Sequence, residues 1–292
     1  MRLPACVLGL LLVCLTAIPG LAATPTASPV ASPALNLVVI GDSIPFAGFC
    51  TECEHAFVDD YALRLEGALG REVKVINRSR NDGAMLNQIA DQVAGEEALR
   101  KQLASADLVI ISAGMNDGPT WYAPHPCGSD IGTSVREAVE QILSYTPACL
   151  DAEVAAREGD FRRLFTEVDA LVPEGTPVAV VNAYNWWSGW QDMVANGTPE
   201  ELAQVDGSIA YFLDAWNAQE CAIAAESGFI CVDLYHAFNG PDGAAPAGDL
   251  LERDYSHPST LGNALIADLL MAADLLGAGA GLPGVAEATP AG

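Results

Sequence analysis

Residues 37–43 run Leu-Val-Val-Ile-Gly-Asp-Ser. Four consecutive branched apolar residues predict a strand that is buried on both faces, as in a parallel sheet. The small, acidic and hydroxylic residues that follow indicate that the chain leaves the core at Ser43. Ligands of open α/β sheets bind beyond the carboxyl ends of the strands, so Ser43 is a candidate site residue. The alternative is that Ser43 only caps a helix after the strand.

Strand and helix patterns alternate along the rest of the chain. Short apolar runs predict further strands at 73–76, 108–111, 178–181 and 229–232. Apolar residues at helical spacing predict helices at 57–69, 85–104 with a break near Gly95, 133–171 with an interruption at Pro147, 200–227 and 260–276. This alternation predicts a single domain over residues 35–278, with a three-layer α/β/α fold around a mainly parallel, five-stranded sheet.

The two ends of the chain differ from this domain in composition. A basic start, an apolar run over 5–18 and the small residues after it predict a signal peptide over 1–23. The Pro-, Ser-, Thr- and Ala-rich residues 24–34 predict a linker, and the Gly-, Ala- and Pro-rich residues 279–292 predict a flexible tail. We therefore expect a secreted protein. Lipoprotein anchoring at Cys14 is disfavoured, because no small residue directly precedes that cysteine.

Charge limits the partners of this chain. Its 292 residues include 13 basic and 38 acidic ones, for a formal net charge of −25. A chain with this charge repels nucleic acid and anionic membrane surfaces. The apolar run near the N-terminus is too short to predict a membrane span. We expect no nucleic-acid partner, no stable membrane insertion and a monomer.

Six cysteines lie beyond the predicted signal peptide. An even number in an exported chain favours disulfides over free thiols. The Cys-x-x-Cys segment at 50–53 could also be a redox or zinc motif, but no second such pair accompanies it, so we expect no metal. The sequence leaves the connectivity open. Pairing of near neighbours predicts the bridges Cys50–Cys53, Cys127–Cys149 and Cys221–Cys231.

Residues suited to catalysis gather where predicted strands end and where the last helix begins. Gly114-Met115-Asn116-Asp117 follows the third strand, and Asp254-Tyr255-Ser256-His257-Pro258 precedes the last helix. A serine that attacks, a histidine that takes its proton and an aspartate that orients the ring are the parts of acyl transfer. An asparagine amide beside a glycine N–H can stabilise the resulting oxyanion. These segments predict nucleophilic catalysis at one edge of the sheet.

A second Asp-x-x-His segment, at 233–236, follows the fifth predicted strand. It lacks the proline and the closing helix that follow His257. Its neighbours Tyr235 and Phe238 predict an apolar setting, in which a neutral, hydrogen-bonded ring is favoured. We therefore expect a structural role for His236.

Together these segments resemble the SGNH (GDSL-like) hydrolase family, from about residue 37 to residue 276. The resemblance implies a flavodoxin-like α/β fold, Ser43 as the nucleophile, and Asp254 and His257 as the rest of the triad. It also implies an oxyanion hole formed by the N–H groups of Ser43 and Gly83 and by the side chain of Asn116. The matching segments, in chain order, are Gly41-Asp42-Ser43 with Gly48, Asn77 to Ala84, Gly114 to Asp117, and Asp254 to Pro258.

The resemblance implies a secreted esterase or lipase that cleaves a small-molecule, lipid or glycan ester without a metal or organic cofactor. A carbohydrate O-deacetylase is the alternative within the enzymes, motivated by the tryptophans that are candidate pocket residues, Trp121, Trp186 and Trp187. These rings could equally anchor a loop from inside. The alternative from another class is a non-catalytic binding module, against which the full set of catalytic residue types argues.

For four other polar residues we expect roles in the structure or at the surface, and not in catalysis. We expect Asp42 to accept hydrogen bonds in its turn, and Asp117 to fix the loop around Asn116. His55 and His125 lie in loops rich in cysteine and proline, where we expect solvated surface residues.

Overall fold

The structure of the chain, a computed structural model, describes residues 32–46, 56–119, 125–128, 134–188 and 197–277. The chain divides into two compact units, residues 1–32 and 33–292, and the elements below all lie in the second. The predicted signal peptide and tail fall outside the described residues and remain predictions. None of the described helices is long and apolar enough to cross a membrane.

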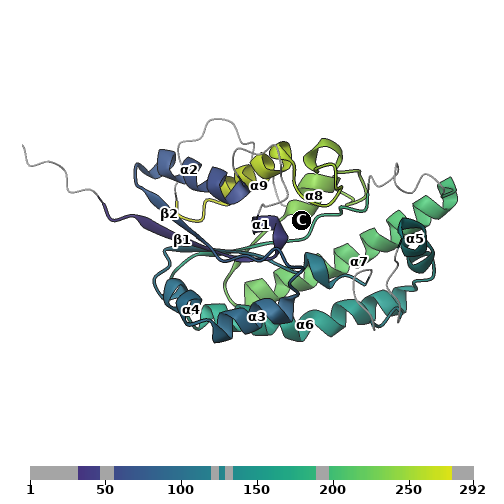
Figure 1. Ribbon diagram of the computed structural model, residues 1–292, viewed down its shortest axis with the longest axis horizontal. Coiled ribbons are helices and arrows are strands. Elements are labelled where there is room, and N and C mark those ends of the chain that lie inside the picture. The colour runs from purple at the N-terminus through teal and green to yellow at the C-terminus, as the bar shows by residue number, and fades with distance from the viewer. Residues whose placement is uncertain (1–31, 47–55, 120–124, 129–133, 189–196, 278–292) are drawn as a thin grey trace, which may run out of the picture. The chain divides into compact units, whose positions relative to one another are not determined.

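One parallel sheet organises the described residues and confirms the predicted fold (Figure 1). Its strands are β1 (Leu35–Gly41), β2 (Val73–Asn77), β3 (Leu108–Ser112), β4 (Val178–Val181) and β5 (Ile230–Val232). They lie in the order β2-β1-β3-β4-β5, and each neighbouring pair is parallel. Nearly all side chains of β1 and β3 are buried, because helices cover both faces of the sheet. This burial explains the unbroken apolar runs of these strands.

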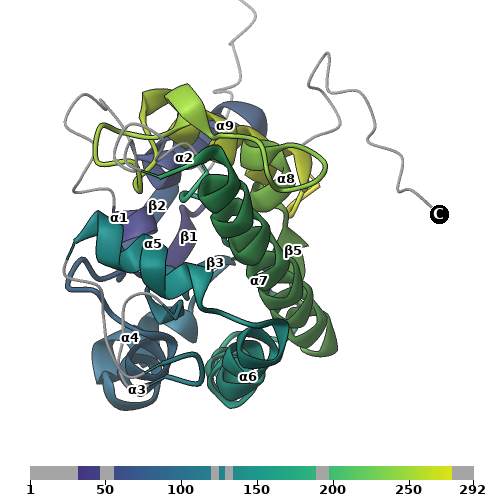
Figure 2. The same cartoon turned by 90° about the vertical axis from the view of Figure 1, so that its right-hand side faces the viewer.

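Two layers of helices enclose the sheet (Figure 1, Figure 2). One face carries α2 (Phe57–Leu69), α8 (Leu234–Asn239) and α9 (Thr260–Ala272). The other carries α3 (Leu86–Gly95), α4 (Glu97–Leu103), α6 (Pro147–Asp169) and α7 (Pro199–Glu226). The remaining described α-helices are α5 (Val135–Leu143), which packs against α7, and the short α1 (Ser43–Phe46) directly after β1; 3₁₀ helices lie at Met115–Asp117 and Gly248–Leu250.

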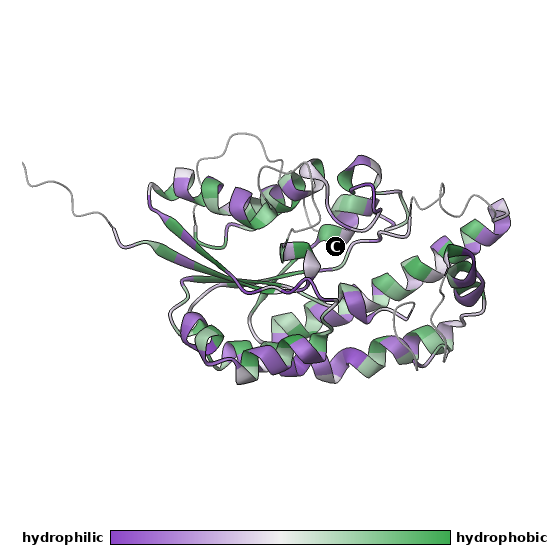
Figure 3. Cartoon of the chain, in the orientation of Figure 1, coloured by the Kyte–Doolittle hydropathy of each residue, from purple (hydrophilic) through white to green (hydrophobic). Residues whose placement is uncertain are grey.

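Local signals set the helix ends. The predicted helix over 133–171 is two helices, because Pro147 begins α6 and Thr146 caps it with its side chain. The predicted break in 85–104 falls where α3 ends at Gly95. Hydrophobic and hydrophilic residues alternate in bands along α3 and α6 (Figure 3), as expected for helices with one buried side. Helix α1 is the helix that the alternative interpretation of Ser43 expects after the first strand, whereas the short α8 has no counterpart among the predicted helices.

The order of the strands reverses between β1 and β3, and in such sheets ligands bind at this switch point. The two strands approach closely here. A Cβ atom on Gly41 would lie 1.9 Å from the carbonyl oxygen of Ser112, so only glycine fits. Ser43 follows β1 and Asn116 follows β3, which places both residues at the switch point.

Two of the three predicted disulfides are present in the structure. Cys127–Cys149 ties a loop to the first turn of α6, and Cys221–Cys231 ties α7 to β5. Cys50 and Cys53 lie outside the described residues.

Candidate active site

The structure brings Ser43, His257 and Asp254 together at the switch point. The Nε2 atom of His257 lies 3.0 Å from the Oγ atom of Ser43, which begins α1. The Nδ1 atom of the same ring lies 2.6 Å from Oδ2 of Asp254. A hydroxyl, an imidazole and a carboxylate in this line can pass a proton from the serine to the ring.

Asp254 also shapes the loop that carries the histidine. Its Oδ1 atom accepts hydrogen bonds from the backbone N–H groups of Ser256 and His257, both at 3.0 Å. Partial burial raises the pKa of Asp254, but these N–H groups and the His257 ring outweigh burial and hold the pKa below its ordinary value. The carboxylate therefore stays ionised beside the imidazole. Tyr255, between these residues, has a φ of 58°, a left-handed conformation that side chains rarely adopt.

The buried side chain of Tyr184 supports the loop that carries His257. The hydroxyl of Tyr184 donates to the backbone carbonyl of Ser256, the residue before His257. The Tyr184 ring is stacked on Phe238, with 4.6 Å between the ring centroids. The Oγ atom of Ser256 itself lies 3.2 Å from Nδ1 of His257. The sequence does not reveal this role of Tyr184, because residues 184 and 256 lie 72 positions apart in the chain.

Asp42 joins the loops after β1 and β3, which confirms its predicted role as a hydrogen-bond acceptor. Its carboxylate accepts from the backbone N–H of Ile44 at 3.1 Å and of Met115 at 3.2 Å. Complete burial raises the pKa of Asp42 to about 6, although these N–H groups act in the opposite direction. The residue thus holds Ser43 in register with the Asn116 loop.

Gly83 and Asn116 line the same cleft as Ser43 and His257, with a volume of about 290 Å³. The Nδ2 atom of Asn116 donates to the carbonyl of Ala84 at 3.1 Å, which joins the two loops. Gly83 has a φ of 71°, a conformation that explains a glycine at this position. The two donors predicted for an oxyanion therefore border the cleft that holds the serine.

Asp117 fixes this region, as predicted. Its Oδ2 atom accepts from the backbone N–H of Leu86 at 2.9 Å and so ties the Asn116 loop to the start of α3. Burial raises the pKa of Asp117 to about 7.

Of the three predicted pocket tryptophans, two are described and both are buried. The rings of Trp186 and Trp187 are stacked, 4.6 Å apart, and Oδ1 of Asn185 accepts from the N–H groups of Trp187 and Ser188. The rings therefore anchor the loop after β4. Trp186 also borders the cleft of Ser43, so both roles left open by the sequence apply to it. Trp121 lies outside the described residues.

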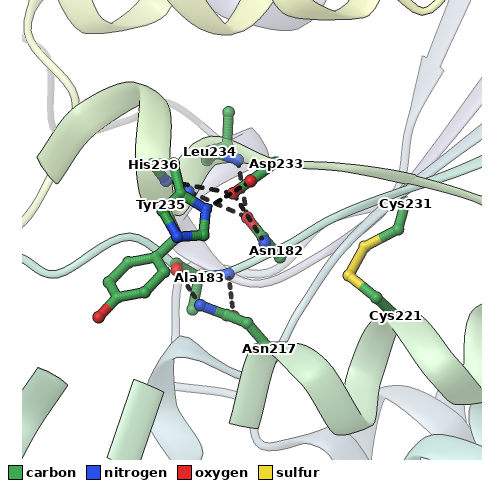
Figure 4. A network of polar contacts seen from close by, with 9 residues as sticks. All are labelled: Asn182, Ala183, Asn217, Cys221, Cys231, Asp233, Leu234, Tyr235 and His236. Carbon is green, nitrogen blue, oxygen red and sulfur yellow. Dashed lines mark hydrogen bonds and ion pairs between the residues drawn. A yellow bond between two sulfur atoms is a disulfide. The ribbon is translucent and has the colours of Figure 1, made fainter. Parts of the chain in front are cut away.

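The second Asp-x-x-His segment forms a similar pair at the start of α8 (Figure 4). Nδ1 of His236 lies 2.6 Å from Oδ2 of Asp233, and Asn182 donates to Oδ1 of Asp233 at 3.2 Å. The expected apolar setting of His236 is wrong, since its side chain is 49% exposed. Helix α8 turns Tyr235 and Phe238 into the core and leaves His236 outside.

The expectation of a solvated surface residue is also wrong for His125. Its side chain is buried, and Nδ1 lies 2.7 Å from Oε1 of the equally buried Glu153. The same Glu153 oxygen accepts from the N–H of Cys127 at 3.0 Å. These three residues are grouped like metal ligands, but the Cys127 sulfur is held in the disulfide and is not a thiolate. His55 lies outside the described residues.

Solved structures share this fold. The lipase Lip_vut3 from a goat rumen metagenome has a TM-score of 0.60 at 18% identity, over 83% of this chain and 98% of that one. A putative GDSL-like lipase from Parabacteroides merdae has a TM-score of 0.52 at 19% identity, over 83% and 96%. A catalytic mutant of an acetylxylan esterase from Geobacillus stearothermophilus has a TM-score of 0.51 at 18% identity, over 84% and 96%. At such low identities, the structural similarity establishes a shared fold and no more.

The sequence itself carries the family assignment. No curated protein matches the chain. Residues 39–265, however, match the family described as GDSL-like Lipase/Acylhydrolase, and this range begins in β1 and ends in α9. The match thus includes the loops of Ser43, Gly83, Asn116 and His257. The chain belongs to the GDSL-like lipase/acylhydrolase family.

Proposed function

We propose that this protein is a serine hydrolase that cleaves carboxylic esters through the triad Ser43, His257 and Asp254. The Ser43 oxygen attacks the ester carbonyl carbon while its proton passes to Nε2 of His257. The imidazolium then protonates the leaving alkoxide, which leaves an acyl group on Ser43. Water, deprotonated by the same ring, attacks this acyl-enzyme and releases the acid and the free serine.

The oxyanion of each tetrahedral intermediate needs fixed donors. We assign this role to the backbone N–H groups of Ser43 and Gly83 and to the amide of Asn116. The position of Gly83 and Asn116 around the cleft of Ser43 supports the assignment. The buried bonds of Asp42 and Asp117 hold these loops before a substrate arrives.

The observation that carries the proposal is the line of contacts, 3.0 Å from Ser43 to His257 and 2.6 Å from His257 to Asp254. A binding module has no need for this alignment at the edge of an open cleft. A carbohydrate O-deacetylase remains a second candidate within the same chemistry, and the position of Trp186 in the cleft wall favours it. We further propose secretion, with which the two disulfides are consistent.

Replacement of the nucleophile tests the function. With p-nitrophenyl acetate we expect Ser43→Ala to lower kcat/KM by a factor of about 10³ or more, with an unchanged melting temperature. The control Ser105→Ala, at an exposed serine far from the cleft, should keep full activity. A fluorophosphonate should label Ser43 alone. Labelling of Ser256, or a Ser43→Ala variant with near-normal turnover, would refute the assignment.

A further inference from the structure

Trp186 borders three neighbouring cavities. One is the cleft of Ser43 and His257. The second, of about 40 Å³, is apolar and includes Gly114, Met115 and Trp216 in its lining. The third, of about 290 Å³, has a mixed lining of Trp186, Ser188, Asp249, Glu252, Arg253 and Tyr255. We refer to the second as the apolar pocket and to the third as the polar pocket.

The proposed chemistry gives the two pockets different places along a bound ester. The leaving oxygen must face His257, which protonates it. The polar pocket is lined by Glu252, Arg253 and Tyr255, from the same loop as His257. Apolar-pocket residues Gly114 and Met115 instead adjoin Asn116 on the oxyanion side. The alcohol part of the ester therefore lies toward the polar pocket and the acyl part toward the apolar pocket.

The size of the apolar pocket limits the acyl group. The volume of the apolar pocket, about 40 Å³, is roughly a seventh of the volume of the cleft, about 290 Å³. This space suits an acetyl or another short acyl chain. A long fatty acyl chain would extend beyond it.

The composition of the polar pocket indicates a hydroxylated ligand. The carboxylates of Asp249 and Glu252 accept hydrogen bonds, and the guanidinium of Arg253 donates them. Trp186 and Tyr255 add aromatic rings to the lining, and a sugar presents an apolar C–H face as well as hydroxyl groups. A lipid alcohol would desolvate the charged groups without replacing their hydrogen bonds. Two carboxylates disfavour a phosphate.

The left-handed backbone of Tyr255 is a second feature of the polar pocket. Left-handed backbone at a residue other than glycine costs free energy and is found at ligand clamps and active sites. At this position the backbone turns between the polar pocket, which Tyr255 lines, and the cleft, which Ser256 and His257 line. The strained residue thus connects the candidate alcohol site to the proposed base.

We propose that the polar pocket binds the alcohol part of the substrate and that this alcohol is a sugar, with a short acyl group in the apolar pocket. The inference rests on the proposed function. It narrows the ester to an acylated carbohydrate.

Two acetate esters that differ only in the alcohol test the proposal. We expect the enzyme to have a kcat/KM at least tenfold higher for a monoacetylated methyl xyloside than for ethyl acetate. The double variant Asp249→Ala/Arg253→Ala should reduce this ratio at least tenfold, mainly through KM for the sugar ester. The control Arg136→Ala, at an exposed arginine paired with Glu140 and Glu201, should leave the ratio unchanged.

The outcomes separate the two proposals. Equal rates on both esters, or an unchanged ratio in the double variant, would overturn the sugar site while the esterase proposal stands. A preference for an octanoate over an acetate ester would overturn the short acyl group. No hydrolysis of either ester, or hydrolysis that survives Ser43→Ala, would overturn the proposed function itself.

Discussion

The two Asp-x-x-His segments of this chain form nearly the same local structure in different surroundings. In both, Nδ1 of the histidine lies 2.6 Å from the aspartate Oδ2, at Asp254–His257 and at Asp233–His236. In both, Oδ1 of the aspartate accepts from the backbone N–H of the histidine, at 3.0 Å and 3.1 Å. Only the first pair meets Ser43. The four-residue motif is enough to form the Asp–His pair. Only the pair at the switch point also lies next to a serine, Ser43.

The surroundings of the two aspartates explain the difference further. Asp233 is the N-cap of α8 and is bonded to Asn182, so it holds a helix end (Figure 4). Asp254 lies in a loop before α9 and caps no helix. The His236 side chain is 49% exposed, while that of His257 is 17% exposed. Lower exposure strengthens the interaction of His257 with its partners.

Exchange of the two histidines for alanine gives the largest contrast. We expect His257→Ala to lower kcat for an ester by about 10³-fold or more, because Ser43 loses its base. His236→Ala should change kcat by less than about threefold, since His236 is bonded to Asp233 and does not line the cleft of Ser43. Steady-state kinetics with p-nitrophenyl acetate measure both. An inactive His236→Ala variant beside an active His257→Ala variant would reverse the assignment.

The aspartates give the next contrast. Asp254→Asn keeps the shape but removes the charge that orients His257 and stabilises its protonated form, so we expect kcat to fall about 10²–10³-fold. Asp233→Asn should leave kcat near the wild-type value. The pH profile distinguishes orientation from folding, since loss of a charged partner shifts the acid limb of kcat/KM. An unshifted profile and unchanged rate for Asp254→Asn would remove the residue from the triad.

The sequence predicts those features of the fold and the site that depend on residues close together in the chain. The apolar run before Ser43 predicts a buried parallel strand because such a strand has no solvent face. Asp254 and His257 are identifiable because the aspartate lies three positions before the histidine in the chain. The pairing Cys127–Cys149 follows from proximity along the chain, and the structure contains it.

Contacts between distant segments were not predictable in this way. The burial of His125 depends on its partner Glu153, which lies in α6, 28 residues away, whereas the local sequence around His125 predicts a surface loop. The exposure of His236 depends on α8, a helix too short to show a clear periodicity. Residues of the polar pocket, such as Asp249 and Arg253, have no motif, and only the fold brings them beside Trp186.

Each Asp–His pair has a tyrosine nearby, Tyr184 for His257 and Tyr235 for His236. Replacing these tyrosines should change kcat less than replacing the aspartates. Tyr184→Phe removes the bond to the Ser256 carbonyl, so the His257 loop loses part of its positioning, and we expect kcat to fall about 10-fold with little change in KM. The matched control Tyr235→Phe, beside His236, removes a long bond of 3.4 Å to the carbonyl of Ala210. Its kcat should stay unchanged. Equal losses in both variants would indicate general destabilisation in place of positioning.

The smallest expected effect concerns stability at the second Asp–His pair. Burial raises the pKa of Asp233, but the His236 ring, the His236 N–H and Asn182 outweigh burial and hold it below the ordinary value of 3.8. A lowered folded-state pKa stabilises the fold above the unfolded-state pKa, and the contribution disappears as pH falls through the folded-state value.

Because the Asp233–His236 pair is about half exposed, solvent screening limits the contribution of this ion pair to the unfolding free energy to below about 1 kcal/mol. The N-cap bond to the His236 N–H is kept in Asp233→Asn, because asparagine caps a helix as well as aspartate does. Asp233→Asn therefore removes only the charge, and it should lower the unfolding free energy by less than about 1 kcal/mol at pH 7, with a difference from the wild type that shrinks below about pH 4. Urea unfolding at pH 7, 5 and 3.5 measures this difference, and a gap that widens toward low pH would contradict the stabilising role of the Asp233 charge.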